Sequence, residues 1–325
     1  MSTIRNNWTR EEITEIYNTP IMELMYRAGT VHREFHDPNE VQVCTLLSVK
    51  TGGCKEDCSY CSQSVRYNTH VKPEKMMGAD DIIVKAKQAK QAGSTRFCMG
   101  AAWREVRENR DFDTLLNVVS EVNGMGMEVC VTLGMVNEQQ AQKLKEAGLH
   151  AYNHNLDTGK EYYDKVITTR TFDDRLDTIH NLQKANVNVC SGGIIGLGEQ
   201  HEDRISMLHT LSTLPKHPES VPVNALVAVE GTPMEGNERV PVWDMVRMIA
   251  TARILMPKAM VRLSAGRKEM PLSEQAMCFM AGANSIFAGD KLLTTPNPEK
   301  NDDNHMFRIL NLKPRVAFKG EGAHV

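Results

Sequence analysis

The feature that most constrains the fold is a regular alternation of short apolar or β-branched runs with longer amphipathic stretches, beginning near residue 42. Eight runs have the length and composition of β-strands: 42–49, 95–100, 127–133, 150–156, 187–194, 221–227, 259–264 and 284–287. Intervening stretches with helical periodicity include 80–91, 138–146, 172–184, 203–214 and 242–255. Because each such stretch can return the chain for another parallel strand, the pattern predicts a closed (β/α)8 TIM-type barrel. A doubly wound open sheet is the alternative, since periodicity does not reveal closure.

Three segments are expected along the chain. Residues 1–40 form an N-terminal helical extension, because Thr9 and Glu12 fit a capping box and Pro20 suits a first helical position. Residues 41–295 form the barrel as one domain, since they contain no linker, low-complexity tract or convincing repeat. Residues 296–325 are expected to form a solvated C-terminal tail.

Charge and hydropathy narrow the class of partner. The chain has 41 acidic and 38 basic residues, so no overall positive field attracts nucleic acid or an anionic membrane. No stretch approaches ~18 uncharged apolar residues, and the first residues lack the apolar run of a signal peptide. We therefore expect a cytoplasmic protein with a small organic substrate. In that compartment the eight cysteines are better explained as metal ligands, catalytic groups or core residues than as disulfides.

Three of these cysteines, Cys54, Cys58 and Cys61, lie in one loop directly after the first predicted strand. In a parallel barrel that loop is at the catalytic face. Gly52 and Gly53 allow the backbone to fold back, so that three sulfur atoms can converge. Three thiolates leave one iron of a 4Fe-4S cluster without a protein ligand, and an open iron can bind a substrate. A structural zinc site is the alternative, with His70 as the nearest candidate for a fourth ligand.

Three more cysteines, Cys98, Cys130 and Cys190, lie near the middle of predicted strands, and Arg262 occupies a similar place in the seventh. Each cysteine taken alone is typical of a small core residue, and an arginine is typical of a solvated edge. Together they share strand parity with polar or small residues such as Arg96, Glu128, Thr132 and Asn188, whereas their apolar neighbours face the helices. In a closed barrel the three thiolates and the cation could enclose a second, smaller iron-sulfur cluster. Cys44 and Cys278 are interpreted as core residues.

Polar groups mark the ends of other strands. Asn153, Asn155 and Asp157 share one face of the fourth strand, and Asn224 lies on the sixth. Such groups suit recognition of ribose hydroxyls or a urea-like ligand, although a polar cap on the barrel is the alternative. His154 has the opposite parity and is interpreted as structural. Gly192 and Gly193 lack the dinucleotide-binding spacing and indicate close backbone approach to a ligand.

These segments together closely resemble the biotin synthases, a family of radical S-adenosylmethionine enzymes. The resemblance extends over residues 45–298 and is most specific in 54–61, 96–103, 152–158, 190–193 and 261–267. Lys55 stands where proline is common in relatives. The resemblance implies a homodimeric barrel that converts dethiobiotin to biotin by radical-mediated sulfur insertion, with electrons from a donor protein such as flavodoxin or ferredoxin.

The resemblance also implies roles for individual residues. Cys54, Cys58 and Cys61 would hold the 4Fe-4S cluster that cleaves S-adenosylmethionine, and with Arg262 they are the expected catalytic residues. Cys98, Cys130, Cys190 and Arg262 would hold a 2Fe-2S cluster that supplies the sulfur. The expected S-adenosylmethionine contacts are Tyr60, Asn155, Asp157 and Arg175, and the expected dethiobiotin contacts are Asn153 and Asn224.

Two other functions fit the same residues. The first is a radical enzyme with the same loop and a different substrate or auxiliary cluster. The second is an iron-sulfur or zinc protein that only transfers electrons or binds, which would not cleave S-adenosylmethionine.

Overall fold

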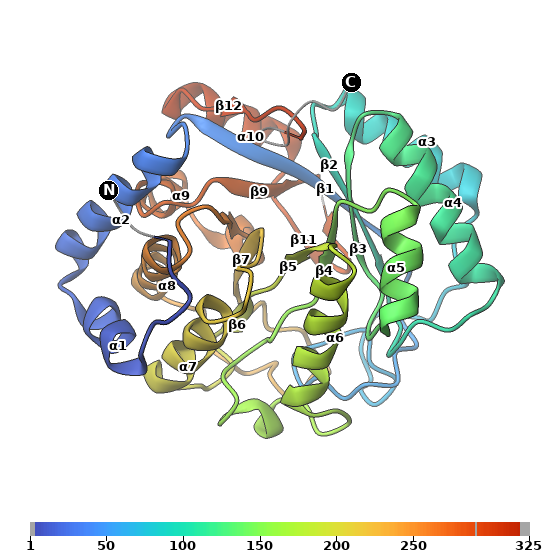
Figure 1. The fold of residues 1–325 in the computed structure, drawn as a ribbon, viewed down its shortest axis with the longest axis horizontal. Coiled ribbons are helices and arrows are strands. Elements are labelled where there is room, and N and C mark those ends of the chain that lie inside the picture. The colour runs from blue at the N-terminus through green and yellow to red at the C-terminus, as the bar shows by residue number, and fades with distance from the viewer. Residues whose placement is uncertain (1–3, 290, 319–325) are drawn as a thin grey trace.

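The computed structural model describes residues 4–289 and 291–318, and its centre is a closed parallel barrel (Figure 1). The barrel strands are β1 (Glu40–Lys50), β2 (Arg96–Ala101), β3 (Glu128–Thr132), β4 (Ala151–Asn153), β5 (Asn188–Cys190), β7 (Ser220–Ala225), β8 (Met260–Leu263) and β9 (Ser285–Ala288). Neighbouring strands pair in parallel, and β9 returns to β1 with Ser285 opposite Gln42. This pairing closes the sheet, which confirms the barrel and excludes the open doubly wound alternative.

The barrel is wrapped by helices that bury one side of every strand. They are α3 (Ala79–Gln91), α4 (Arg110–Gly124), α5 (Glu138–Glu146), α6 (Phe172–Lys184), α7 (His201–Ser212), α8 (Val242–Leu255) and α9 (Leu272–Met280). Phe97, Met99, Val129 and Val131 are fully buried in the layer between strands and helices. The strand parity predicted from the sequence is therefore confirmed, and the alternate residues face the barrel interior.

One predicted strand is interrupted. The run expected over 187–194 divides into β5 and β6 (Gly193–Ile195), and β6 pairs with β7 and forms a single bridge with Asp157. A Cβ atom on Gly192 would lie 2.0 Å from the Pro222 carbonyl oxygen, and one on Gly193 would lie 2.2 Å from the Met207 sulfur. These glycines thus permit close approach to the neighbouring strand and to α7. Their predicted close approach to a ligand stays a prediction.

The N-terminal helices pack against the outside of the barrel. The capping box predicted at Thr9 and Glu12 begins α1 (Arg10–Asn18), and α2 (Ile21–Phe35) follows. Here α1 contacts α7, and α2 lies along α8. Arg253 on α8 is buried against this extension, where its Nη1 lies 2.9 Å from the His36 Nε2 atom. Residues 1–3 of the predicted extension lie outside the described residues.

Replacing His32, which α2 buries, is expected to make the protein less sensitive to acid. Burial and the charge of Arg253 lower the pKa of His32 to about 4, from an ordinary value of 6.5. A depressed folded-state pKa gives stability that is present above pH 6.5 and is lost as the pH falls toward 4. At pH 5 this residue should therefore cost about 2 kcal/mol of folding free energy relative to pH 7. His32→Leu should remove that increment in urea unfolding at the two pH values.

The control is the same substitution at His70, which is exposed. His70→Leu should leave the pH dependence of the unfolding free energy as it is in the wild type. An unchanged pH dependence in His32→Leu would show that another group senses the acid.

The C-terminal segment is folded, contrary to the solvated tail predicted for it. It follows the hairpin of β10 (Lys291–Leu292) and β11 (Thr295–Pro296), and it contains α10 (Lys300–Leu310) and β12 (Lys313–Pro314), which pairs with β1. The buried Arg267 guanidinium binds the Asp303 carboxylate at 2.5 Å, which anchors α10 to the barrel. Residues 319–325 of the predicted tail lie outside the described residues. Within the described part of the chain, no helix is long and apolar enough to cross a bilayer.

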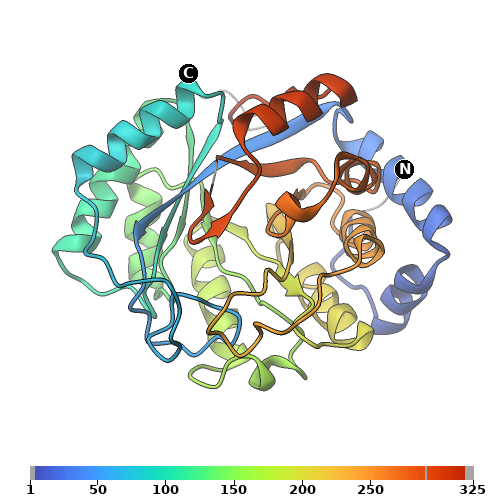
Figure 2. The same ribbon diagram turned by 180° about the vertical axis from the view of Figure 1, so that it is seen from behind.

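The two ends of the barrel differ in what covers them. In Figure 2, α10 lies at the upper edge, whereas the segment that follows β1 lies at the lower edge. β12 pairs with Glu40 at the N-terminal end of β1, so it marks the end where the strands begin. The cysteine loop thus lies at the other end, where the parallel strands terminate and where barrels of this kind carry their active sites.

Candidate active site

A cavity of about 330 Å³ occupies the end of the barrel where the strands terminate. It is lined by side chains from the loop after β1, from the barrel interior and from the β10–β11 hairpin. The lining includes most residues singled out in the sequence: Cys54, Cys58, Tyr60, Cys61, Cys98, Cys130, Asn153, Asn155, Asp157, Arg175, Asn224 and Arg262. Two groups of cysteines that are 37 or more residues apart in the chain thus line one cavity: Cys54, Cys58 and Cys61 of the loop, and Cys98 and Cys130 of the strands.

The cysteine loop is held by hydrogen bonds to its own backbone and to the loop before α6. Gly52 and Gly53 adopt φ values of 65° and 74°, which glycine tolerates best. The Asp57 carboxylate accepts hydrogen bonds from the backbone N–H groups of Thr168 and Thr169 at 2.9 and 3.1 Å. Burial would raise the pKa of Asp57, but these hydrogen bonds lower it to about 2. A permanent charge therefore fixes the loop to its neighbour.

Two of the loop thiols lie near the Arg170 guanidinium: Cys58 is buried and Cys61 is half-buried. Burial raises the pKa of Cys58 to about 12, although the Arg170 guanidinium opposes this from 3.6 Å. Burial also raises the pKa of Cys61 to about 11. Thiols in such an environment stay protonated on their own, whereas metal ligation displaces the proton. Their setting suits a metal centre better than a free nucleophile.

Two arginines, Arg170 and Arg175, line the cavity beside these thiols. Arg175 donates a hydrogen bond to the Asp157 carboxylate, and both side chains are buried. The Tyr163 hydroxyl accepts hydrogen bonds from Arg175 at 3.0 Å and from Arg170 at 3.3 Å. Asp157 has φ 70°, a left-handed conformation that is strained for this residue. Backbone strain held by an ion pair is typical of a functional site.

The two asparagines predicted to contact dethiobiotin, Asn153 and Asn224, differ in how many hydrogen bonds they can still form with a ligand. Both ends of the Asn224 amide are engaged: Nδ2 donates to the Gly193 carbonyl at 2.9 Å, and Oδ1 accepts from Ala265 at 3.2 Å. Asn153 donates through Nδ2 to the Thr132 hydroxyl at 3.2 Å, and its Oδ1 has no hydrogen bond among the described residues. Asn153 is thus better prepared to accept a hydrogen bond from a ligand in the cavity.

The strand cysteines meet inside the barrel, below the cysteine loop. Cys98 and Cys130 are paired across β2 and β3. Cys190 is fully buried and does not line the cavity, and its sulfur lies 3.6 Å from Arg262 Nη1. Arg262 is 1% exposed, so the solvated-edge interpretation is wrong, and its charge faces the thiols. Burial raises the pKa of Cys190 to about 11, although the Arg262 charge opposes this rise.

Cys44, interpreted as a core residue, belongs to this thiol group. Its sulfur lies 3.4 Å from Arg262 Nη2, and it packs in one cluster with Cys98 and Cys130. Burial would raise the pKa of Cys44, but a hydrogen bond with Cys98 and the Arg262 charge lower it to about 6. The signal was present in the sequence, because Cys44 shares its strand parity with the polar Gln42.

A network of ion pairs and hydrogen bonds lies across the barrel interior on the other side of the thiols from the cavity. Arg96 is fully buried and binds Glu128 at 2.8 Å and Glu219 at 2.7 Å. Gln42 donates to Glu128 at 3.0 Å and accepts from Ser285, which in turn accepts from Arg262. Burial would raise the pKa of Glu219, but Arg96 lowers it to about 2. The arginine that faces the thiols is thus positioned by hydrogen bonds that lead to a second buried arginine.

Removing the charge of Arg96 is expected to destabilise the fold strongly. Arg96→Met would remove the buried guanidinium that binds both Glu128 and Glu219, at a cost of about 3–5 kcal/mol. The matched control is Lys143→Ala, which breaks an exposed ion pair with Glu108 and should cost less than about 1 kcal/mol. Urea unfolding of both apo variants checks this, and a cost below about 1 kcal/mol for Arg96→Met would contradict the role assigned to the network.

Several residues of the cavity were missed in the sequence. Arg170 and the hairpin residues Leu293, Thr294 and Thr295 line it. Thr294 meets Ser62 of the cysteine loop at 2.9 Å between hydroxyl oxygens, so the hairpin closes over the loop. His154, interpreted as structural, also lines the cavity, and its buried Nε2 has no hydrogen-bond partner among the described residues.

The donor chemistry discriminates between the two metals considered. His70, which a zinc site would need as its fourth ligand, is exposed and is not among the cavity residues. Among residues 4–289 and 291–318, no three His, Cys, Asp or Glu side chains are placed so that they could hold a single metal ion. Cys54, Cys58 and Cys61 line the cavity together with Cys98 and Cys130, and Cys190 is buried behind them beside Arg262. Sulfur donors grouped in this way, with an arginine beside each group, fit cluster chemistry.

Comparison with known proteins covers nearly the whole chain. Residues 48–211 match the Radical SAM superfamily model, and residues 222–313 match the Biotin and Thiamin Synthesis associated domain. A biotin synthase of Cytophaga hutchinsonii is 69% identical over 99% of this chain and 96% of its own length. The mitochondrial biotin synthase of Arabidopsis thaliana is 61% identical over 96% of this chain and 82% of its own.

Solved structures of more distant proteins have the same fold. The structure of methylornithine synthase has a TM-score of 0.78 and 20% identity, and covers 94% of both chains. The hydrogenase maturase HydG has a TM-score of 0.80 and 17% identity, over 95% of this chain and 72% of its own. At these identities the likeness concerns the barrel alone.

Proposed function

The chain belongs to the biotin synthase family of radical S-adenosylmethionine enzymes, and from this premise we propose which residues perform each part of the reaction. The reaction is the radical-mediated insertion of sulfur into dethiobiotin to form biotin. The observation that supports the assignment is that one cavity is lined both by Cys54, Cys58 and Cys61 of the loop and by Cys98 and Cys130 inside the barrel.

Two cysteine sets would hold two clusters. Cys54, Cys58 and Cys61 would hold a 4Fe-4S cluster, because three thiolates leave one iron free for S-adenosylmethionine. The residues that would hold a 2Fe-2S cluster are Cys98, Cys130, Cys190 and Arg262, which are buried together. When bound, the clusters and S-adenosylmethionine supply the radical and the inserted sulfur.

The remaining side chains would bind and orient the reactants. Asp157 is paired with Arg175 and lines the cavity with Tyr60 and Asn155, and its carboxylate oxygens would accept hydrogen bonds from ribose hydroxyls of S-adenosylmethionine. The Asn155 Oδ1 already accepts from Gly192 at 3.2 Å, which leaves its Nδ2 to donate. Asn153 has a free oxygen for a ureido N–H of dethiobiotin, and Asn224 shapes the wall beside it. The β10–β11 hairpin would exclude water from the radical.

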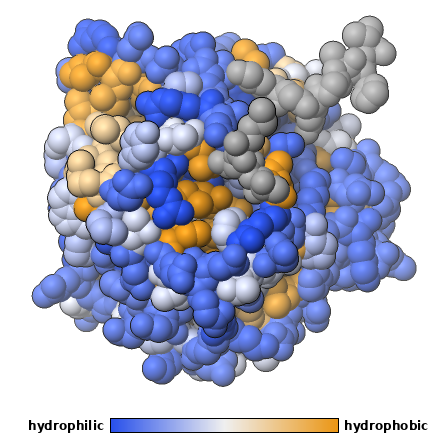
Figure 3. Space-filling model, turned by 60° about the vertical axis from the view of Figure 1, so that its left-hand side comes forward, coloured by the Kyte–Doolittle hydropathy of each residue, from blue (hydrophilic) through white to orange (hydrophobic). Residues whose placement is uncertain are grey.

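We further expect a cytoplasmic homodimer supplied with electrons by flavodoxin or ferredoxin. Figure 3 brings the side that carries α1 and α2 forward, and its apolar residues gather in a central hollow and at the upper left. Large apolar side chains exposed on α2 and α9 include Met22 and Met280. Exposed apolar groups of this kind suit a subunit contact, and light scattering of the reconstituted protein tests for the dimer.

The function is tested by product analysis. Protein reconstituted anaerobically with iron and sulfide, then given reductant, S-adenosylmethionine and dethiobiotin, should release 5'-deoxyadenosine and biotin. Release of 5'-deoxyadenosine without biotin would indicate a radical enzyme with another substrate. Absence of 5'-deoxyadenosine would indicate a protein that only binds or transfers electrons.

A further inference from the structure

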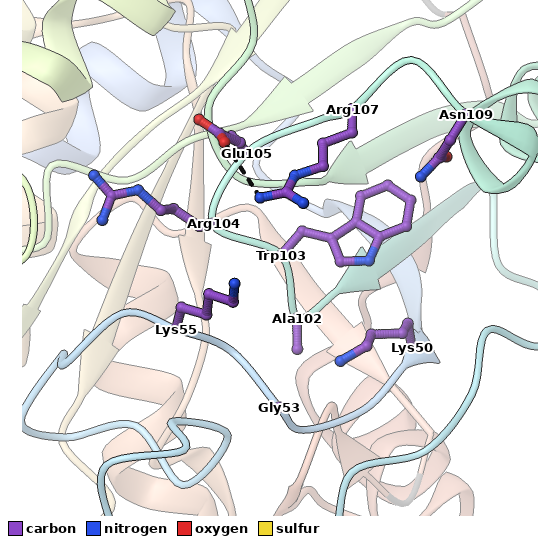
Figure 4. A pocket seen from close by; sticks show the side chains of 9 residues that line it. All are labelled: Lys50, Gly53, Lys55, Ala102, Trp103, Arg104, Glu105, Arg107 and Asn109. Carbon is purple, nitrogen blue, oxygen red and sulfur yellow. Dashed lines mark ion pairs between the residues drawn. The ribbon is translucent and has the colours of Figure 1, made fainter.

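A second cavity, of about 240 Å³, lies on the outer side of the cysteine loop (Figure 4). Four basic side chains line it, Lys50, Lys55, Arg104 and Arg107, together with Trp103 and a single carboxylate, Glu105. In Figure 4 Lys55, from the cysteine loop, and Arg107, from the segment after β2, extend toward the same space. The pocket is therefore built from two separate segments of the chain.

The pocket is positively charged although the chain as a whole is not. The whole chain carries a formal charge of −3, whereas four cations face one acid here. Glu105 lies 3.8 Å from Arg107 and offsets one of the four positive charges, so the lining keeps an excess of positive charge. Lys55 is exposed and has no ion pair among the described residues. The local field therefore attracts anions.

The pocket shares a wall with the active-site cavity. Ala102 and Trp103 line both spaces, and Gly53 in the basic pocket directly precedes Cys54 in the cavity. Arg104 lies 3.5 Å from the buried Glu56 carboxylate, which also faces Arg170 at 3.8 Å on the inner side. A partner seated in the pocket would thus contact the cysteine loop at Lys55 and be separated from the active-site cavity by the shared wall of Ala102 and Trp103.

We propose that this basic pocket docks the acidic surface of a one-electron carrier protein that reduces the cluster at Cys54, Cys58 and Cys61. The inference rests on the proposed function, which requires an electron from outside the chain. The carrier is oxidised by one electron and the cluster is reduced by one, with no bond formed or broken. Carboxylates on the carrier would pair with Lys55 and Arg107, and complementary charge chiefly accelerates such encounters.

The test reverses the two most exposed charges and compares two reductants. Reduced flavodoxin needs to dock, whereas reduced methyl viologen is a small cation that gains nothing from a basic pocket. In Lys55→Glu/Arg107→Glu, the rate of 5'-deoxyadenosine formation with flavodoxin at low salt should fall at least about tenfold. The rate with methyl viologen should stay within about twofold of the wild type. About 0.5 M salt should slow the flavodoxin reaction of the wild type and narrow the difference.

The matched control reverses two exposed charges at the opposite end of the barrel, in Lys184→Glu/Lys258→Glu. These residues precede β5 and β8, whereas the cysteine loop follows the end of β1. This variant should keep the wild-type rate with both reductants. Titration calorimetry with oxidised flavodoxin should show a Kd raised at least about tenfold for the pocket variant only.

Other results overturn the proposal in distinct ways. A pocket variant that keeps the wild-type rate and Kd with flavodoxin would place the docking surface elsewhere. Slowing with methyl viologen as well would show that the pocket binds a small anion or supports the loop. Wild-type protein that makes no 5'-deoxyadenosine even with methyl viologen would overturn the proposed function itself, and docking with it.

Discussion

Cys58→Ala is expected to abolish 5'-deoxyadenosine formation, to below about a thousandth of the wild-type rate, because it removes a group on which the whole reaction depends. Cys58 is 7% exposed and lies between the loop backbone and Arg170. Two remaining thiols cannot retain a 4Fe-4S cluster that leaves one iron open. Iron and sulfide analysis with Mössbauer spectra should show loss of the 4Fe-4S signal and retention of the 2Fe-2S signal.

The matched control is Cys278→Ala, which removes another buried thiol far from either set, on α9. It should retain both cluster signals and the wild-type rate. If Cys58→Ala still formed 5'-deoxyadenosine, the cleavage site would not be the cysteine loop.

Cys98→Ala is expected to separate the two halves of the reaction. Cys98 is directly opposite Cys130 in the barrel and lies away from the loop thiols in the chain. Its loss should remove the 2Fe-2S signal and lower biotin formation at least about a thousandfold, since no sulfur donor remains. Reductive cleavage of S-adenosylmethionine should persist, because the loop thiols are intact.

The two cysteine variants therefore serve as controls for each other. Loss of both cluster signals in Cys98→Ala would undo the assignment of two sites. Retention of the 2Fe-2S signal in Cys98→Ala would assign that cluster to other ligands. Cys44, which lies beside Arg262, would then be the next residue to substitute with alanine.

The barrel could be predicted because its signals are local. Strand parity repeats every two residues, so Cys98 and Arg96 in one strand, and Cys130 and Glu128 in the next, were expected on the interior without knowledge of the fold. The helices followed from apolar periodicity in the same way. Closure itself depends on Gln42 pairing with Ser285, a contact between chain ends that no local pattern contains.

The features that were missed depend on distant partners. The run Asn301-Asp302-Asp303-Asn304 is typical of a solvated tail, yet Asp303 is buried because Arg267 binds it. The β10–β11 hairpin depends on Asn297, whose amide donates to the Phe287 and Gly289 carbonyls. The roles of Tyr60 and Asn155 came from resemblance, since a sequence does not reveal which ligand a polar strand end contacts.

The thiols inside the barrel face the cavity at the end where the strands terminate, through Cys98 and Cys130. Cys98, Cys130 and Cys190 are at most 3% exposed, and the network of Arg96, Glu128 and Glu219 closes the space below them. Iron or sulfide that reaches Cys98 and Cys130 from the cavity would pass through the space proposed for the substrate. On this route, we expect that a spent centre can be rebuilt only after the substrate or product has left the cavity.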